Sequence, residues 1–269
     1  MVRREDGWHC VAVVPSCGAF MTFRFGGDVE WSARQTVGGD RVCPADLLRQ
    51  AARLLGGAQV DLVAVDMPLA RSPVRGRRRA DDEVSRQFAA AWCGTHSPTA
   101  QRPGVLSDIL REEFEAEGYR LATKGVSAER SGRAGGAGHL IPAEPGQTDK
   151  ARTLIEVYPH AALLTLLTVD RRVPYKVNKT LDYWPHEPLA TRRRHLVLVE
   201  QHRILRALRT EIQDIDLPLP QPDSPGTLAS LKPFEDALDA LVCCWVGIRY
   251  LEGKAVAYGD EDAAVWVPR

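Results

Sequence analysis

The 269 residues are enough for one large domain or two small ones, and a hydrophobic content of 44% is enough for a buried core. The 35 basic and 35 acidic side chains balance, so no global positive field attracts nucleic acid, and any such contact needs a local basic patch. The longest apolar run, residues 240–248, is about half as long as a membrane-spanning helix, and the N-terminal residues show no export signal. The six cysteines do not have the spacing of zinc ligands. We therefore expect a soluble, cytoplasmic protein.

The first part of the chain predicts strands, then a helix, then a buried strand. Two short apolar runs, residues 8–14 and 19–25, predict a β-hairpin. Residues 45–55 place apolar side chains at helical spacing behind Pro44, which predicts an amphipathic helix. Residues 60–69 are apolar without alternation, a pattern typical of a central strand buried on both faces, and Asp66 lies near its end.

Residues 71–150 are interpreted as an insertion. They begin with an arginine-dense stretch and continue with two predicted helices, residues 80–92 and 107–118, before a glycine-rich segment at residues 131–146 that we expect to form a loop.

The second half predicts one more buried strand and then helices. Residues 154–158 form a short apolar run that carries Glu156. Residues 190–212 predict a long charged helix, whose arginines 192–194 should face solvent or a polyanion. The proline-rich residues 218–225 precede a last amphipathic helix from Pro233 to Gly253. The order of elements predicts a layered α/β sheet in a single domain, residues 1–269.

Four carboxylates are candidates for chemistry. Asp66 and Glu156 lie near the carboxyl ends of separate buried strands, where ligand sites of open α/β sheets collect. Asp236 and Asp239 are three residues apart and are neighbours on one face of the last helix, off its apolar stripe. Clustered carboxylates usually imply a hard divalent cation with oxygen ligands, so Mg²⁺ or Mn²⁺ is the expected cofactor.

Each carboxylate also has an ordinary structural interpretation. Asp66 precedes Met67 and Pro68 and would also suit a turn. A buried Glu156 could instead form a salt bridge to an arginine. Asp236 lies in the first turn of a helix, where the helix dipole favours any acid, so Asp239 is the more informative of the two.

Ordered motifs across nearly the whole chain resemble one known family. They are residues 63–69 (VAVDMPL), 79–81 (RAD), 154–160 (LIEVYPH), 175–176 (YK), 235–242 (EDALDALV) and 259–260 (GD) through 266–268 (WVP). In this order they are similar to the domain-of-unknown-function family 429, whose members are described as predicted ribonuclease H-like nucleases. The start of the last helix also resembles that of bacterial Holliday-junction resolvases, which belong to the same structural superfamily.

The resemblance implies a mixed sheet flanked by helices, and a divalent-metal-dependent hydrolysis of phosphodiester bonds by two ions. By position it implies that Asp66 is the fourth-strand ligand, that Asp236 and Asp239 are the helix ligands, and that Glu156 is an added acid of this family. DNA and RNA remain equally open as substrates, and the sequence is silent on oligomeric state.

One departure from the family concerns the first strand and its aspartate. The family opens with a strand that ends in Asp-Gly, and Gly-Trp then starts the second strand. Here Gly7 and Trp8 match that second start, so we expect the first strand to be missing or very short. Either the natural protein begins further upstream, or this member has lost one metal ligand.

Basic residues near the acidic motifs are candidates for substrate contacts. Lys176 or Lys179 would contact a phosphate, and Arg77 and Arg79 belong to a cluster that directly follows the Asp66 strand. A solvated arm or loop explains these residues equally well. His160 follows the Glu156 strand, where it is either a proton shuttle or structural.

Two other functions compete with the nuclease. A catalytically inactive relative that binds nucleic acid or a protein is consistent with the departure in the first strand. A phosphotransferase of the related ATPase fold is disfavoured, because no glycine-rich phosphate loop follows a strand.

Overall fold

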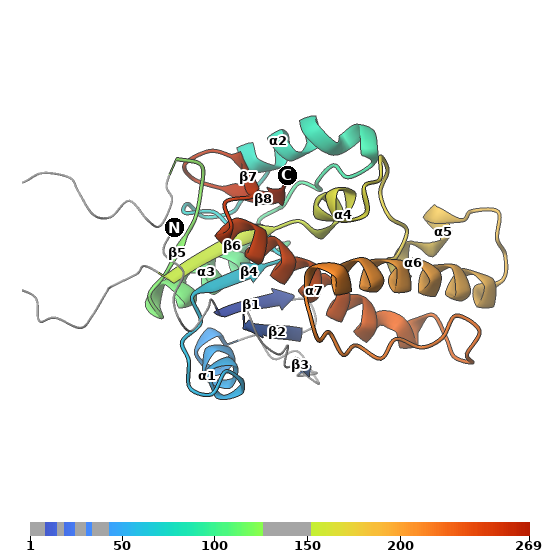
Figure 1. Cartoon of the computed structure of the whole chain (residues 1–269). Helices are drawn as coiled ribbons and strands as arrows, with labels where there is room; N and C mark the ends of the chain where they lie inside the picture. Colours follow the sequence, from blue (N-terminus) through green and yellow to red (C-terminus); the bar gives the residue numbers. More distant parts are fainter. Residues whose placement is uncertain (1–8, 15–18, 25–30, 34–42, 126–151) are drawn as a thin grey trace, which may run out of the picture.

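A computed structural model of the chain describes residues 9–14, 19–24, 31–33, 43–125 and 152–269 (Figure 1). Its strands are β1 (His9–Val14), β2 (Ala19–Arg24), β3 (Trp31–Ala33), β4 (Leu62–Val65), β5 (Tyr119–Leu121), β6 (Arg152–Val157), β7 (Ala255–Gly259) and β8 (Ala264–Pro268). Its α-helices are α1 (Pro44–Leu54), α2 (Arg79–Phe88), α3 (Val105–Ala116), α4 (Pro159–Leu167), α5 (Thr180–Tyr183), α6 (Ala190–Glu211) and α7 (Lys232–Leu251). None of the helices in these ranges is long and apolar enough to cross a bilayer.

The strands form one mixed, eight-stranded sheet in the order β3-β2-β1-β4-β6-β8-β7, with β5 paired to the first part of β6. The pairs β1-β4, β4-β6 and β6-β8 are parallel, and antiparallel pairs lie on both sides of this centre. The parallel strands run towards the side of the molecule where α5 and α6 extend (Figure 1). This mixed sheet with its flanking helices confirms the expected α/β class and is compatible with a ribonuclease H-like architecture.

The position of the first strand is filled, which corrects the expectation of a missing or very short one. β1 has six residues, lies between β2 and β4, and pairs antiparallel with the former and parallel with the latter. The predicted hairpin therefore supplies the first two strands of the sheet. The expected departure still holds for chemistry, because the β1 sequence HCVAVV contains no acidic residue.

The two faces of the central strands pack against different helices. Leu62 and Ala64 of β4 belong to the core cluster that includes side chains of α4, α6 and α7. Val63 and Val65 belong to a second cluster with side chains of α1 and α3. Because successive side chains of a strand point to opposite faces, β4 is apolar at every position. This explains why its sequence shows no alternation.

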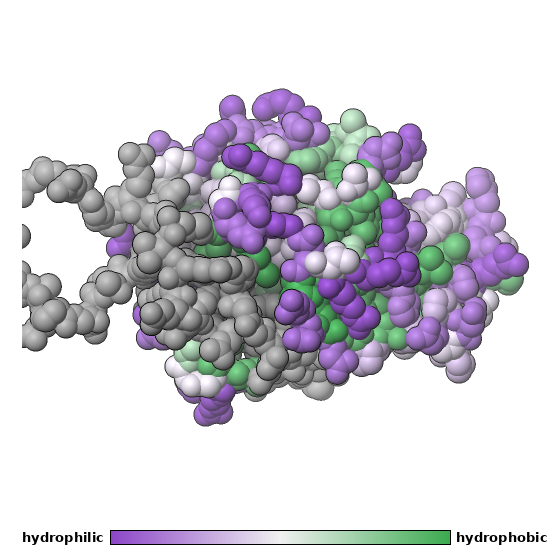
Figure 2. Space-filling model, in the orientation of Figure 1, coloured by the Kyte–Doolittle hydropathy of each residue, from purple (hydrophilic) through white to green (hydrophobic). Residues whose placement is uncertain are grey.

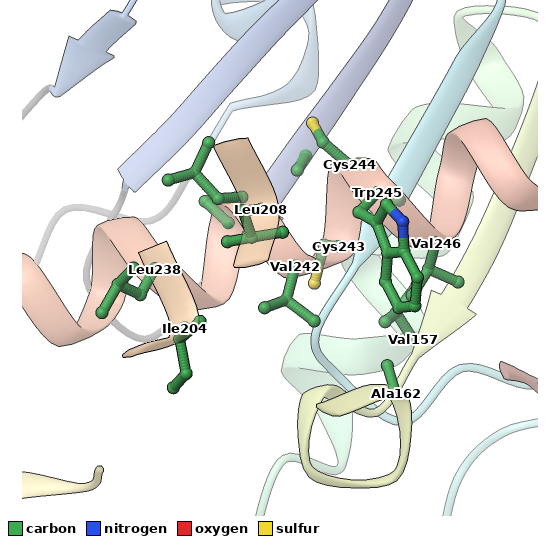
Figure 3. Packing of buried hydrophobic residues seen from close by; sticks show 14 of the residues in the cluster. Val157, Ala162, Ile204, Leu208, Leu238, Val242, Cys243, Cys244, Trp245 and Val246 are labelled. Carbon is green, nitrogen blue, oxygen red and sulfur yellow. The ribbon is translucent and has the colours of Figure 1, made fainter. Parts of the chain in front are cut away.

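Helix α7 is buried nearly all round along its middle. Residues 235–247 of this helix are all buried, because the helix packs on the sheet and also contacts α4 and α6. Figure 3 shows this packing, in which Leu238 and Val242 belong to the same cluster as Ile204 and Leu208 of α6. Each buried leucine contributes about 2 kcal/mol through removal of apolar surface from water. The acidic residues of α7 are thus held on a rigidly packed helix.

Most predicted helices and strands are present, and their bounds differ slightly. Within the interpreted insertion the structure has α2, α3 and β5, whereas the glycine-rich segment lies outside the described residues. Arg194 does not face solvent as expected: it is buried, and its Nη1 donates a 2.5 Å hydrogen bond to the carbonyl oxygen of Ser224 in the proline-rich connector. The structure adds α4, β5, β7 and β8, which the sequence patterns did not predict.

Candidate metal centre

Asp66 directly follows β4 at the carboxyl edge of the sheet. Its side chain is half-buried, and within the described part of the chain no hydrogen bond or ion pair of its carboxylate is formed. Burial raises the pKa of Asp66 to about 7, with a further contribution from the negative charge of Asp239. Nearby Lys176 and Lys232 oppose this shift without cancelling it. The turn interpretation, in which backbone N–H groups would satisfy the carboxylate, therefore has no support in these contacts.

Helix α7 brings three more carboxylates together. Oxygen atoms of Glu235, Asp236 and Asp239 lie within 4.8 Å of one another, and all three side chains are buried. Asp236 and Asp239 are therefore close neighbours, as the sequence predicted. Both acids lie off the apolar stripe of α7 and were expected on its polar side. They are buried instead, because α7 is surrounded by other elements at this point. Burial also raises the pKa of Asp236, against the opposing effect of Lys232.

Two lysines lie among these acids. Lys176 forms an ion pair with Asp239, and its Nζ is 3.7 Å from Oε1 of Glu235. Lys232, in the first turn of α7, forms an ion pair with Asp236, and its Nζ is 2.9 Å from Oε1 of Glu235. The structure therefore places Lys176 against an acid of α7, whereas the sequence predicted a contact with a substrate phosphate.

The residues on either side of Lys176 are also anchored to α7. The hydroxyl group of Tyr175 donates a 2.5 Å hydrogen bond to Oδ1 of Asp239. The backbone N–H of Val177 donates a 2.6 Å hydrogen bond to Oε2 of Glu235. Glu235 and Asp239 thus fix the segment 175–177 by both backbone and side-chain contacts.

Glu156 lies in a separate ionic network. Its Oε1 and Oε2 accept hydrogen bonds of 2.8 and 2.6 Å from Nη2 and Nη1 of Arg78, and the backbone N–H of Leu69 donates another of 2.7 Å to Oε2. Arg78 also pairs with Asp81, at 2.9 Å between Nη2 and Oδ1. The salt-bridge alternative for Glu156 is therefore what the structure shows. Its carboxylate has an internal cation and needs no metal for charge balance.

Strand alternation explains why Asp66 and Glu156 differ. Residues 62 and 64 face α7, so residue 66 continues towards the same face. In β6, Ile155 and Val157 face α7, whereas Leu154 packs on the α1 and α3 side, so Glu156 points away from α7. Asp66 directly follows β4, Glu156 lies within the adjacent parallel strand β6, and the two carboxylates lie on opposite faces of the sheet.

The predicted substrate arginines are held by acids and hydroxyl groups of α2. Nε of Arg77 is 2.6 Å from Oδ1 of Asp82, and its Nη2 is 2.9 Å from Oγ of Ser85. Nε of Arg79 is 3.2 Å from Oε1 of Glu83. Both arginines are exposed. In Figure 2 hydrophilic residues spread over most of the coloured part of the face shown, with small apolar areas between them.

His160 has a structural environment. It is buried between aromatic rings, with ring centroids 5.6 Å from Tyr158 and 5.5 Å from Tyr175, and its Nε2 is 2.6 Å from Nη2 of Arg172. Burial, with the positive charges of Lys176 and Arg172, lowers the pKa of His160 well below its usual range. A neutral ring that contacts Tyr175 supports the segment before Lys176.

The sequence did not identify Glu235, Lys232 and Tyr175 as members of the centre. Glu235 and Lys232 have the spacing of a first helical turn, where an acid needs no special explanation. Tyr175 stood out only as part of a dipeptide motif of the family, and Lys176 was expected to contact a phosphate. The signal that would have found them is the burial of this part of α7, which depends on contacts with distant elements.

Comparisons with known proteins give one match. Residues 3–263 match a family described as "Protein of unknown function (DUF429)". Neither the curated proteins nor the solved structures contain a match to this chain.

Proposed function

The chain belongs to this DUF429 family, and from the acidic centre at the carboxyl edge of its sheet we propose that it is a divalent-metal-dependent nuclease, which hydrolyses phosphodiester bonds of DNA or RNA. The observation that carries the proposal is the cluster of three buried acids on α7, together with Asp66 after a central parallel strand, whose pKa the charge of Asp239 helps to raise. Carboxyl ends of parallel strands are where ligand sites collect in such sheets.

The donor atoms fit Mg²⁺ or Mn²⁺. These hard cations prefer carboxylate oxygens, and the three α7 acids present such oxygens within 4.8 Å of one another. When all four are ionised, Asp66 and the three α7 acids carry two more charges than Lys176 and Lys232 balance. Asp66, Asp236 and Asp239 are the residues that would hold the metal.

The chain's own residues have separate roles in this proposal. A bound divalent ion would supply Lewis-acid activation of water and stabilisation of the leaving oxygen. Tyr175 and Lys176 hold the Asp239 carboxylate in one orientation, and Glu235 fixes the backbone of residue 177. Glu156 and Arg78 are positioning residues, because they join β6 to the segment that follows Asp66. We place this activity in the cytoplasm, since the cysteine spacing favours a reducing compartment.

The test is cleavage of a panel of labelled DNAs and RNAs, in Mn²⁺ and in Mg²⁺. We expect the full chain to cleave at least one substrate, and Asp239→Asn to reduce the rate by about 100-fold or more, because changes beyond the direct ligands already cost about 10- to 100-fold. Asp182→Asn is the matched control, because this exposed acid pairs with Lys179 away from the centre, and it should keep full activity. No cleavage above the Asp239→Asn level with any substrate would refute the nuclease.

A second function, non-catalytic binding of nucleic acid or protein, is favoured by two observations. β1 carries no acidic residue, and the Glu156 carboxylate is already paired with Arg78. Melting temperature distinguishes the two functions. The nuclease should melt at a higher temperature in Mn²⁺ than in EDTA, and Asp239→Asn should lose that difference, whereas a binding protein with no metal should show none.

A further inference from the structure

Lys176 is a buried cation surrounded by acids from two elements. Its ammonium group pairs with Asp239 and lies 3.7 Å from Oε1 of Glu235, and its side chain is 18% exposed. Burial alone would lower the pKa of Lys176, but the charges of Asp239, Asp66 and Glu235 outweigh burial and raise it. These contacts place the ammonium group inside the acidic centre.

The backbone around Lys176 holds this ammonium group in place. Tyr175 and Val177, its two neighbours, donate hydrogen bonds to Asp239 and Glu235. Nε2 of the fully buried Gln201 donates a 3.3 Å hydrogen bond to the carbonyl oxygen of Tyr175. A shift of the backbone at residues 175–177 would break contacts to both α6 and α7. Its place among the acids is thus a property of the fold.

Charge balance limits how many further cations the centre can take. Asp66, Glu235, Asp236 and Asp239 bring four negative charges when all are ionised, and Lys176 and Lys232 bring two positive charges, which leaves two negative charges. One divalent ion neutralises this remainder. A second would leave the centre positive before any substrate arrives, and repulsion between charges at close range is costly inside a protein.

We propose that the ammonium group of Lys176 is a built-in cation of the acidic centre, which therefore takes one divalent ion per chain where the family resemblance implies two. The proposal rests on the proposed function only in its assumption that the centre binds a divalent metal. Lys176 takes a charge-balancing place beside Asp239 and Glu235, as Lys232 does beside Asp236 and Glu235, and the single ion would balance the negative charge that remains. A phosphate contact, the role predicted from sequence, would instead need an ammonium group free of acids.

The test is the Mn²⁺ stoichiometry of the full-length chain, measured by titration calorimetry and by the electron paramagnetic resonance of unbound Mn²⁺. We expect one ion for the natural chain and two for Lys176→Met, which removes the charge and keeps an unbranched side chain of similar length. Lys176→Arg should stay at one ion because it keeps the charge. Lys179→Met is the matched control, since this nearby lysine pairs with exposed Asp182, and it should also stay at one.

Several results would overturn the proposal. Two ions in the natural chain would do so without any variant, and so would an unchanged stoichiometry in a folded Lys176→Met. If Lys176→Met is unfolded in EDTA, its melting temperature is measured in Mn²⁺ instead. A melting temperature restored to that of the natural chain supports the built-in cation, and a lower one contradicts it. The outcome for the nuclease is separate. One bound ion without cleavage keeps the role of Lys176 and refutes the nuclease, whereas no bound ion in the natural chain overturns both the one-ion proposal and metal-dependent hydrolysis.

Discussion

Asp66 and Glu156 are both carboxylates near the ends of neighbouring strands, but their surroundings differ. Glu156 is paired with Arg78, which lies 78 residues away in the sequence, and Asp66 meets acids of α7 instead of a cation of its own. Sequence pattern could identify both residues as acids at the ends of buried strands. It could not tell which acid is neutralised, because the answer depends on the sheet face that each side chain reaches.

Asp66→Asn is expected to stabilise the chain above neutral pH when divalent cations are removed. The pKa of Asp66 is raised from 3.8 to about 7, mainly by burial. Between these values the native chain keeps a proton on Asp66 that the unfolded chain has lost, so the stability contributed by this group falls as the pH rises through the window. Each pKa unit corresponds to about 1.4 kcal/mol, and allowing for the solvent access of Asp66 we expect the variant to gain about 1–3 kcal/mol at pH 8.

Urea unfolding in EDTA at pH 4 and at pH 8 measures this effect. The two chains should differ little in free energy of unfolding at pH 4, because this pH lies only just above the ordinary pKa of 3.8 and most of the window up to about 7 lies above it. Asp182→Asn serves as control, because Asp182 is exposed and its variant should match the natural chain at both values. A variant less stable than the natural chain at pH 8 would contradict the assigned environment of Asp66.

The network around Arg78 joins three elements of the fold. Arg78 precedes α2, Glu156 belongs to β6, and the backbone of Leu69 belongs to the segment after β4. Helices α1, α2, α3, α6 and α7 could be predicted from the pattern of their own sequence, whereas α4 and α5 were not predicted. The short strands β5, β7 and β8 could not be predicted, because their pairing with β6 and with each other involves residues far apart in the chain.

Glu156→Gln is expected to destabilise the chain by about 3 kcal/mol, because removal of one partner from a buried ion pair leaves the other charge without compensation. Both side chains of the pair are less than 10% exposed. Asp82→Asn breaks the solvent-exposed pair with Arg77 and should cost less than about 1 kcal/mol, so it is the matched control. Urea unfolding measures both values. Equal costs for the two variants would show that the Glu156–Arg78 pair does not join these elements, and a Mn²⁺ affinity lost in a folded Glu156→Gln would make Glu156 a metal ligand.

The whole molecule has no excess positive charge, and the basic residues that follow β4 are largely committed to its own acids. Arg75 pairs with Asp108, and Arg77 and Arg79 pair with acids of α2. Arg71 is exposed, and in the described ranges its guanidinium pairs with no carboxylate. The composition predicted that a nucleic-acid contact would need a local patch. It could not show that ion pairs already reduce the positive charge of that patch.

We therefore expect weakly salt-dependent binding of nucleic acid. Each phosphate neutralised on duplex DNA contributes about −0.9 to the slope of log K against log salt concentration. Binding through the stretch that follows β4, where Arg75, Arg77 and Arg79 are in ion pairs, should therefore give a slope shallower than about −4. Fluorescence anisotropy of a labelled duplex between about 50 and 200 mM NaCl, with Ca²⁺ in place of Mn²⁺, measures this slope. Asp82→Asn should make it steeper by about one unit, because the variant releases Arg77 from its ion pair. A slope of about −8 in the natural chain would contradict binding through the arginines that follow β4 with their ion pairs closed, because that stretch has too few cations outside ion pairs to neutralise that many phosphates.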